Sequence, residues 1–304
     1  MNQPRSKVIA GLCMLILRCA GAGAFGYPVT HPVFRPTETL PQVMRELAPV
    51  LKLSDTQLVA AVPETNGLQY VHCPACDSGA QDNQLAWNGP ADPHGLHCRF
   101  DGTVFPNPKY PETGRLTVRD PTGELHTFRY YVRPDGLKCF LDAKADFLAK
   151  MGMARFAQDY GEAYELTGNS AYARRTALIL ARFAAVFPHY MPWHDYPAKG
   201  GDYPIENQPP DAHFDDWNES FWTPWSYQMF PVPLLLAYDA IHDSGALQRI
   251  APDLDARIVR NIFDRSIQFD LDMQDNLTTA LPYSYRALTQ AGLVLGRPAL
   301  IPHA

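Results

Sequence analysis

The chain has 304 residues, of which 46% are hydrophobic and 19% are charged. This composition excludes an intrinsically disordered protein, because so much apolar sequence can bury a sizeable core. The formal net charge of −6 disfavours general nucleic-acid binding, which requires a basic surface.

Residues 1–24 have the three parts of a secretory signal peptide. Arg5 and Lys7 give a charged start, residues 8–17 form an apolar run, and residues 22–24 are the small residues of a cleavage site. The apolar run is too short to span a membrane, and no later segment is apolar enough to do so. We therefore expect a soluble protein that is secreted or periplasmic.

Residues 25–68 predict a helical lead-in to the mature chain. Between residues 36 and 64, apolar side chains recur at the spacing of one helix face, at Leu40, Val43, Met44, Leu47 and Leu51. A small amphipathic helical segment is therefore expected here.

Residues 69–135 predict a small insert of turns and short strands that is similar to a zinc ribbon. Cys73 and Cys76 have the CxxC spacing that lets one tight turn bind a tetrahedral metal, and Cys98 supplies a third thiol. Asp101 occupies the position of the fourth cysteine of a ribbon, and His97 is the rival fourth ligand, since zinc accepts carboxylate and imidazole. We expect structural Zn²⁺, because a closed four-ligand site leaves no position for a substrate.

Disulfides are the alternative for the same cysteines in an oxidising compartment. The mature chain has four, at Cys73, Cys76, Cys98 and Cys139, which could form two bridges. Later in the insert, residues 116–119 and 125–131 flank the turn sequence Asp-Pro-Thr-Gly and predict a β-hairpin.

Residues 136–304 have a helical pattern almost throughout. Two long apolar-periodic segments meet at Thr167-Gly-Asn169, a break so short that the two helices must be antiparallel. Helical periodicity returns at residues 234–242, 254–269 and 283–294. The sequence thus predicts a mainly α fold, either an α/α toroid of helical hairpins whose loops form a cleft, or another all-helical domain.

Four segments of the helical region together resemble the heparinase II/III-like polysaccharide lyases, including their alginate-lyase relatives. They are residues 164–180, 236–241, 275–276 and 290–296, and the cysteine segment with Gly-Thr-Val-Phe-Pro-Asn is similar to an insert in some members. The resemblance covers roughly residues 36–301. It implies an α/α toroid followed by a β-sandwich. The later toroid hairpins and the sandwich have no counterpart before Ala304, so we expect a partial toroid and an incomplete family member.

The resemblance also implies cleavage of uronic-acid glycans by β-elimination. This reaction requires neutralisation of the C5 carboxylate, a base for the adjacent proton and an acid for the departing O4. Asn276 matches the carboxylate-neutralising asparagine of the family, and a helix N-cap is its alternative role. Tyr283 and Tyr285 could supply a phenol, although neither matches the catalytic tyrosine of the family, and aromatic packing is their alternative.

Residues 213–227 have a composition typical of carbohydrate binding, with three of the five tryptophans of the chain. Indole faces stack on sugar rings while carboxylates bind hydroxyls, so we expect the loop to bind an acidic polysaccharide or oligosaccharide. The candidate residues are Asp216, Trp217, Glu219, Trp222, Trp225 and Tyr227. Alternatively, the loop packs its own aromatics.

Two other functions remain open. Asp215, Asp216 and Glu219 could serve a toroid glycoside hydrolase with paired carboxylates. A non-catalytic glycan-binding protein is the other alternative, since an incomplete toroid could bind without turnover.

Overall fold

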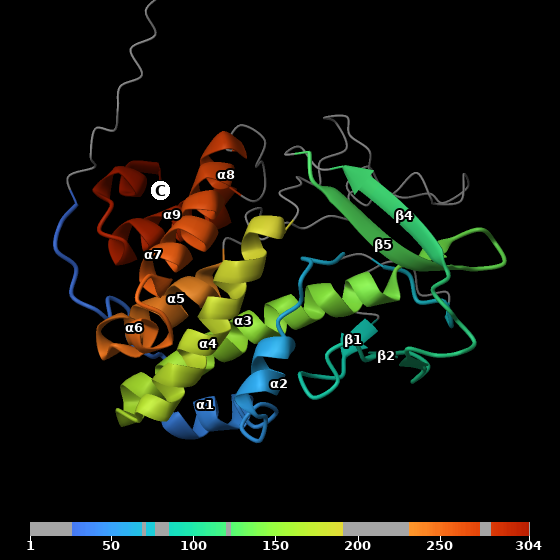
Figure 1. Ribbon diagram of the computed structural model, residues 1–304, viewed down its shortest axis with the longest axis horizontal. Coiled ribbons are helices and arrows are strands. Elements are labelled where there is room, and N and C mark those ends of the chain that lie inside the picture. The colour runs from blue at the N-terminus through green and yellow to red at the C-terminus, as the bar shows by residue number, and fades with distance from the viewer. Residues whose placement is uncertain are drawn as a thin grey trace, which may run out of the picture.

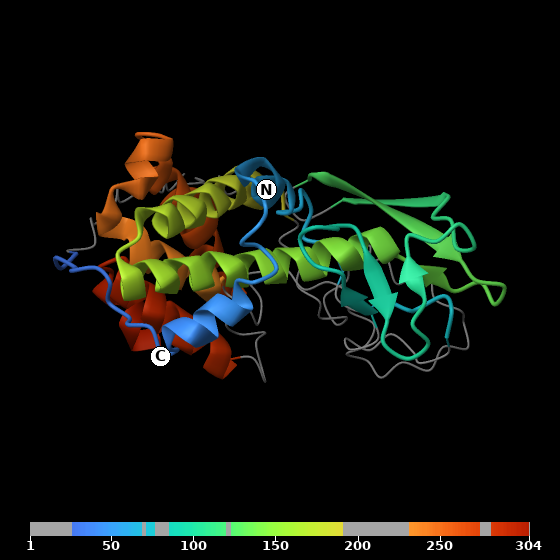
Figure 2. The same ribbon diagram turned by 90° about the horizontal axis from the view of Figure 1, so that it is seen from below.

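The computed structural model describes residues 26–68, 71–76, 85–119, 123–190, 231–273 and 281–303. The predicted signal peptide lies outside the described residues. One long helix, α3, joins a helical half to a half built from small antiparallel sheets (Figures 1 and 2).

The β half contains two groups of strands. In the first, β2 (Leu96–Cys98) lies between β1 (Leu85–Trp87) and β3 (Val104–Phe105), and all pairs are antiparallel. In the second, β5 (Leu125–Val132) pairs with β4 (Gly114–Arg119) on one side and with β6 (Lys138–Cys139) on the other. The predicted hairpin is confirmed.

Helix α3 (Leu141–Thr167) is 27 residues long and contacts both halves of the molecule. Its first turns contact β1 and β5, and its later turns pack against α4 (Ser170–Val186) and α5 (Val232–Ile241). Gly168 ends α3 in the left-handed conformation, with φ at 68°, and the Asn169 side chain accepts the Ala171 N–H to begin α4. The predicted break between two antiparallel helices is therefore confirmed.

The described helices that follow α5 in the chain, with three 3₁₀ turns, also belong to the helical half. They are α6 (Ala246–Ile250), α7 (Leu254–Ile258), a π-helical turn (Val259–Asp264), α8 (Arg265–Met273), α9 (Leu281–Val294) and 3₁₀ turns at Phe187–His189, His242–Ser244 and Pro298–His303. The larger core cluster is shared by these helices, and it includes the buried aromatics Tyr160, Phe183 and Phe263. The mainly α prediction is confirmed.

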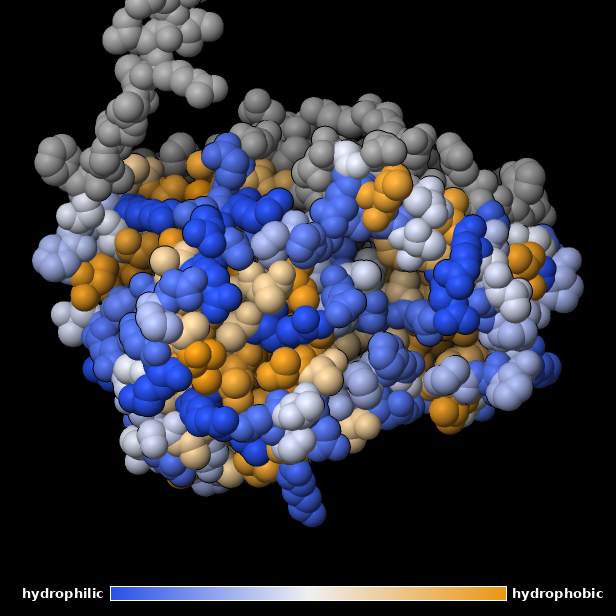
Figure 3. All heavy atoms as spheres, viewed as in Figure 1, coloured by the Kyte–Doolittle hydropathy of each residue, from blue (hydrophilic) through white to orange (hydrophobic). Residues whose placement is uncertain are grey.

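The face of the molecule in Figure 3 carries both apolar and hydrophilic side chains. On the face in Figure 3, apolar residues (orange) appear between hydrophilic ones (blue). The exposed large hydrophobic residues of the described chain are Tyr27, Phe100, Val104, Leu125, Val132, Leu166 and Tyr283. No described helix is long and apolar enough to cross a membrane.

The N-terminal lead-in forms two short helices, α1 (Leu40–Glu46) and α2 (Asp55–Ala60), with turns between them. The helical prediction for residues 36–64 therefore holds only in part. The Ser54 side chain accepts the Gln57 N–H, and the Gln57 side chain accepts the Ser54 N–H. This capping box begins a second helix where the apolar periodicity suggested continuity.

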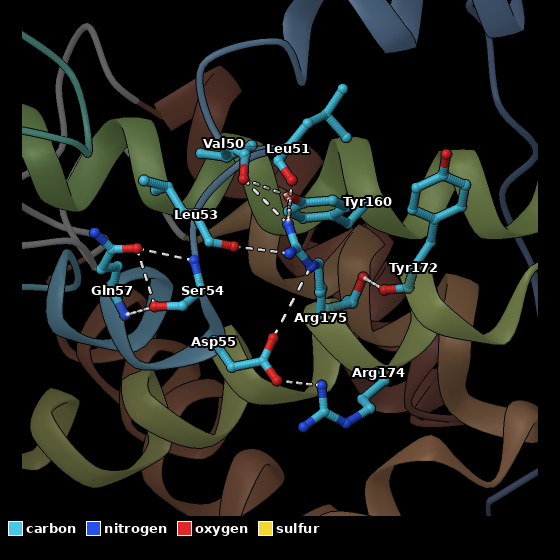
Figure 4. Close-up of polar contacts among 11 residues, drawn as sticks. Val50, Leu51, Leu53, Ser54, Asp55, Gln57, Tyr160, Tyr172, Arg174 and Arg175 are labelled. Carbon is cyan, nitrogen blue, oxygen red and sulfur yellow. Dashed lines mark hydrogen bonds and ion pairs between the residues drawn. The ribbon is translucent and has the colours of Figure 1, made fainter.

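Arg175 on α4 holds the turns between α1 and α2 against the helical hairpin (Figure 4). Its guanidinium donates to the carbonyl oxygens of Val50, Leu51 and Leu53 at 3.1, 3.3 and 2.8 Å, and to the Tyr160 hydroxyl at 2.7 Å. The Tyr160 hydroxyl in turn donates to Val50 O at 3.2 Å. One side chain thus satisfies several backbone carbonyls that no helix pairs.

We expect Arg175→Met to destabilise the fold by about 2–3 kcal/mol, because it removes the side-chain donor of the Leu51 and Leu53 carbonyls while keeping most of the aliphatic volume. The free energy of unfolding in urea would measure the loss. Arg174→Met is the matched control, since Arg174 is exposed and pairs with Asp55 at the surface, where an ion pair contributes below about 1 kcal/mol. Equal stability of the two variants would contradict the anchoring role.

Candidate functional site

Cys73, Cys76 and Cys98 form a cluster that could hold a metal ion. Their three Sγ atoms all lie within 4.8 Å of one another, and the Cys76 and Cys98 Sγ atoms are 3.6 Å apart. Tetrahedral coordination with Zn–S bonds of about 2.3 Å places sulfur atoms about 3.8 Å apart. The predicted grouping of these three cysteines is therefore present, at a spacing that suits tetrahedral binding.

Backbone N–H groups point at two of these sulfurs. The Ala75 N–H donates to Cys73 Sγ, and the N–H groups of Phe100 and Asp101 donate to Cys98 Sγ. Burial raises the pKa of the Cys73 and Cys98 thiols, and these N–H groups oppose that rise because they stabilise a thiolate. A bound metal would displace the thiol protons, and the same backbone N–H groups would then donate to the metal-bound thiolates.

The two predicted fourth ligands lie differently relative to the cluster. Asp101 is exposed, and its carboxylate accepts the Thr103 N–H at 2.9 Å and the Cys98 thiol, contacts that lower the pKa of the carboxyl group. His97 precedes Cys98 on β2, so its side chain lies on the opposite face of the strand. Its Nδ1 is instead 2.9 Å from Asn88 Oδ1. The structure therefore brings Asp101, and not His97, beside Cys98, but among the described residues the group of ligand atoms within 4.8 Å of one another contains the three cysteines and neither of these side chains.

The cysteines are free thiols in the described chain, including Cys139, which lies on β6 outside the cluster. Burial raises the pKa of the Cys139 thiol to about 12. Cys139 is therefore a buried thiol that lies outside the three-cysteine cluster.

A cleft of about 690 Å³ lies in the helical half. Four segments that are distant in sequence line it: the extended chain before α1, the middle of α3, the start of α5 and the face of α9. The polar residues that line it are Arg35, Thr37, Arg155, Gln158, Glu162, Glu165, Tyr283, Arg286 and Gln290. The volume of this cleft is within the range of small-molecule binding sites.

Asp239 on α5 fixes the N-terminal segment that contributes to this cleft. Its carboxylate accepts the backbone N–H groups of Val33 and Phe34, both at 2.9 Å, and lies 2.6 Å from His31 Nδ1. The Asp239 side chain is 1% exposed, so these contacts replace its hydration. The result holds Phe34 and Arg35 at the edge of the cleft.

The three arginines of the cleft differ in how they are engaged. Arg155 pairs with Glu38 at 2.8 Å and with Asp159 at 2.9 Å. The Arg35 side chain is 76% exposed and lies 3.6 Å from Glu165. Arg286 is exposed, and within the described chain it makes no hydrogen bond or ion pair. The Arg286 guanidinium is therefore available to an anionic ligand.

Two carboxylates come from one face of α3. Glu162 is 8% exposed, and its Oε1 accepts the Gln158 Nε2 donor at 2.6 Å. The Glu165 side chain is 7% exposed. Burial raises the pKa of Glu165 to about 7, Arg35 opposes this rise, and the negative charges of Asp239 and Glu162 add to it. Glu165 therefore changes protonation near neutral pH.

The predicted catalytic and binding residues have different outcomes. Tyr283 is 64% exposed and lines the cleft, whereas Tyr285 is half-buried and does not line it. Asn276 lies outside the described residues, as do the loop residues Asp216, Trp217, Glu219, Trp222, Trp225 and Tyr227. Sequence reasoning did not single out Arg286, Glu162 or Glu165.

Similarity to known proteins was tested in three ways. The chain matches no protein-family model, and comparisons with curated proteins and with solved structures found no match either.

Proposed function

We propose that this chain is a polysaccharide lyase that cleaves uronic-acid glycans by β-elimination in the cleft between α3, α5 and α9. The observation that carries the proposal is Arg286, which has no hydrogen bond or ion pair to any described residue and lines the cleft together with Tyr283. The two residues are three apart on α9 and therefore share one face of the helix. The resemblance to heparinase II/III-like lyases supports the same reaction and an α/α toroid as the wider fold.

Two of the three requirements of β-elimination, the neutralisation of the carboxylate and the base, have a candidate group in this cleft. The Arg286 guanidinium can bind the uronate carboxylate through two parallel hydrogen bonds, which acidifies the proton at C5. Tyr283, exposed at the same helix face, is the candidate base for that proton, which it would take as the phenolate. Arg286 thus takes the role that the sequence suggested for Asn276, and Arg35 adds positive charge for an acidic polysaccharide partner.

Arg286→Gln tests the proposal. We expect turnover of a uronic-acid polymer to fall by about 100-fold, because the variant loses the charge that neutralises the carboxylate in the transition state. Arg265→Gln is the matched control, since Arg265 is an exposed arginine on α8 that does not line the cleft. Equal rates for the two variants would contradict the assignment of Arg286.

A glycoside hydrolase is the second candidate, and Glu162 and Glu165 favour it. Two nearly buried carboxylates in one cleft could act as an acid and a base on either side of a scissile bond. A hydrolase creates new reducing ends without the unsaturated uronide that a lyase leaves. A glycan-binding protein would show saturable binding and no product at all.

The three-cysteine cluster is proposed as a structural zinc site, with Asp101 as the fourth ligand. Thiolates and one carboxylate form a donor set that zinc accepts, and the sulfur spacing suits its tetrahedral geometry. Its place in the β half separates it from the cleft residues, so it stabilises the insert and takes no part in the elimination. We also propose that the protein is exported, as the predicted signal peptide in residues 1–24 indicates.

A further inference from the structure

The departing glycosidic oxygen needs a proton, whether the cleft performs elimination or hydrolysis. An alkoxide is a poor leaving group in water, and a positioned acid lowers this barrier by about 10²- to 10⁴-fold. Tyr283 and Arg286 serve the C5 proton and the carboxylate in the proposed reaction, so a separate acid is needed at O4.

We propose that Glu165 is the catalytic acid that protonates this departing oxygen. The assignment rests on the proposed function, because it presupposes that a glycan is cleaved in the cleft. Glu165 is on α3 and lines the cleft together with Tyr283 and Arg286 of α9. Acid and base thus come from different helices of one cleft.

The surroundings of Glu165 suit a group that keeps its proton until a substrate arrives. The side chain is 7% exposed, and its Oε2 is buried with no hydrogen bond from any described residue. The nearest cation, Arg35, is 3.6 Å away, too far for a hydrogen bond, and its side chain is 76% exposed to water. A carboxylate here would be poorly solvated, which favours the neutral acid.

The charged neighbours of Glu165 come from three elements. Glu162 on α3 and Asp239 on α5 repel a carboxylate at this position, and Arg35 before α1 attracts it. Burial is the largest cause that raises the pKa of Glu165 to about 7, Arg35 opposes the rise, and the charges of Asp239 and Glu162 add to it. Glu162 is less suited to the role, because the Gln158 amide already donates to its Oε1 at 2.6 Å.

The proposed step is balanced within the cleft. Tyr283 enters the step as the phenolate and takes the C5 proton to become the neutral phenol, and the electron pair of the C5–H bond forms the double bond between C4 and C5. The C4–O4 bond breaks with its electron pair on oxygen, and O4 takes the proton of Glu165. The step leaves Glu165 as a carboxylate and the proton on Tyr283, and exchange with water restores both groups.

Glu165→Gln should lower kcat on a uronic-acid polymer by about 100-fold or more with little change in KM, because the amide cannot donate an acidic proton. The fraction of Glu165 that carries the proton falls as pH rises above about 7, and this loss should give the wild-type rate an alkaline limb. This alkaline limb should be missing from the residual activity of the variant.

A synthetic uronide with fluoride at C4 separates an acid from a positioning residue. Fluoride departs without a proton, so Glu165→Gln should cleave this substrate within about threefold of the wild-type rate. Asp270→Asn is the control, since Asp270 is a buried carboxyl with a raised pKa that does not line the cleft. We expect this control to keep the wild-type pH profile.

The outcomes are distinguishable. A wild-type protein that releases no product from any uronic-acid glycan would overturn the proposed function and the role of Glu165 with it. An active wild type together with an equal loss in Glu165→Gln on polymer and fluoride would overturn the acid assignment alone. An unchanged alkaline limb in the pH profile of Glu165→Gln would also overturn the assignment of Glu165 as the acid.

Discussion

Replacing Cys98 with serine is expected to abolish metal binding and to unfold the sheet of β1, β2 and β3 while the helical half stays folded. The strands of this sheet have only two or three residues each, so their own hydrogen bonds cannot hold them. Cys73 and Cys98 are themselves part of the small core beneath. A structural zinc ion contributes on the order of 10 kcal/mol to such a fold.

Metal analysis and thermal unfolding would measure this effect. A strong chelator should destabilise the wild-type protein as the substitution does. Added zinc should restore the chelated wild type but not the variant. Cys139→Ser is the matched control, because it alters a buried thiol outside the cluster and should leave the metal bound. Purified wild-type protein without metal, or one that unfolds identically with and without chelator, would refute the zinc site.

Asp270→Asn is expected to remove part of the pH dependence of stability. Asp270 on α8 is fully buried, its Oδ2 accepts the Ser284 hydroxyl at 3.2 Å, and burial raises its pKa to about 8. In the unfolded chain this pKa is about 3.9, so the folded state holds the proton more tightly. The associated stability is present below about pH 4 and is lost as pH rises to about 8.

The amide cannot ionise, so we expect Asp270→Asn to be more stable than the wild type by about 3–5 kcal/mol at pH 8 and nearly equal to it at pH 4. Denaturant unfolding at both pH values measures the difference. Glu112, Asp146, Asp159 and Glu165 also have raised pKa values, so the variant should retain a weaker slope of the same sign. A variant as pH-dependent as the wild type would rule out Asp270 as a source.

Much of the fold could be predicted because its signals are local. The break at Thr167-Gly-Asn169 combines a left-handed glycine with an N-cap asparagine, and each works within one helical turn. The hairpin of β4 and β5 and the grouping of the three cysteines follow from equally short patterns. The lead-in was harder, because the Ser54 capping box interrupts an apolar periodicity that reads as continuous.

The cleft could not be predicted because its residues converge only in the folded chain. Glu165 reads as an ordinary charge near the end of a long helix, and its pKa rises only because the folded chain buries it and places the charges of Asp239 and Glu162 near it. Arg286 is a single exposed arginine without any local sequence motif. Among the described residues of this part of the chain, Tyr283 was the only predicted site residue that lines the cleft. Arg175 lies in a helix whose arginines look like a basic surface in the sequence. In the folded chain its side chain instead donates hydrogen bonds to backbone carbonyls of the N-terminal lead-in.

Product analysis with uronic-acid polymers is the most direct test of the central claim, that this cleft performs β-elimination. Wild-type protein should release oligosaccharides whose new non-reducing ends absorb ultraviolet light, at one absorbing end for each new reducing end. Reducing ends without this absorbance would identify a hydrolase. The absence of any product across alginate, polygalacturonate and glycosaminoglycan substrates would contradict catalysis in the cleft.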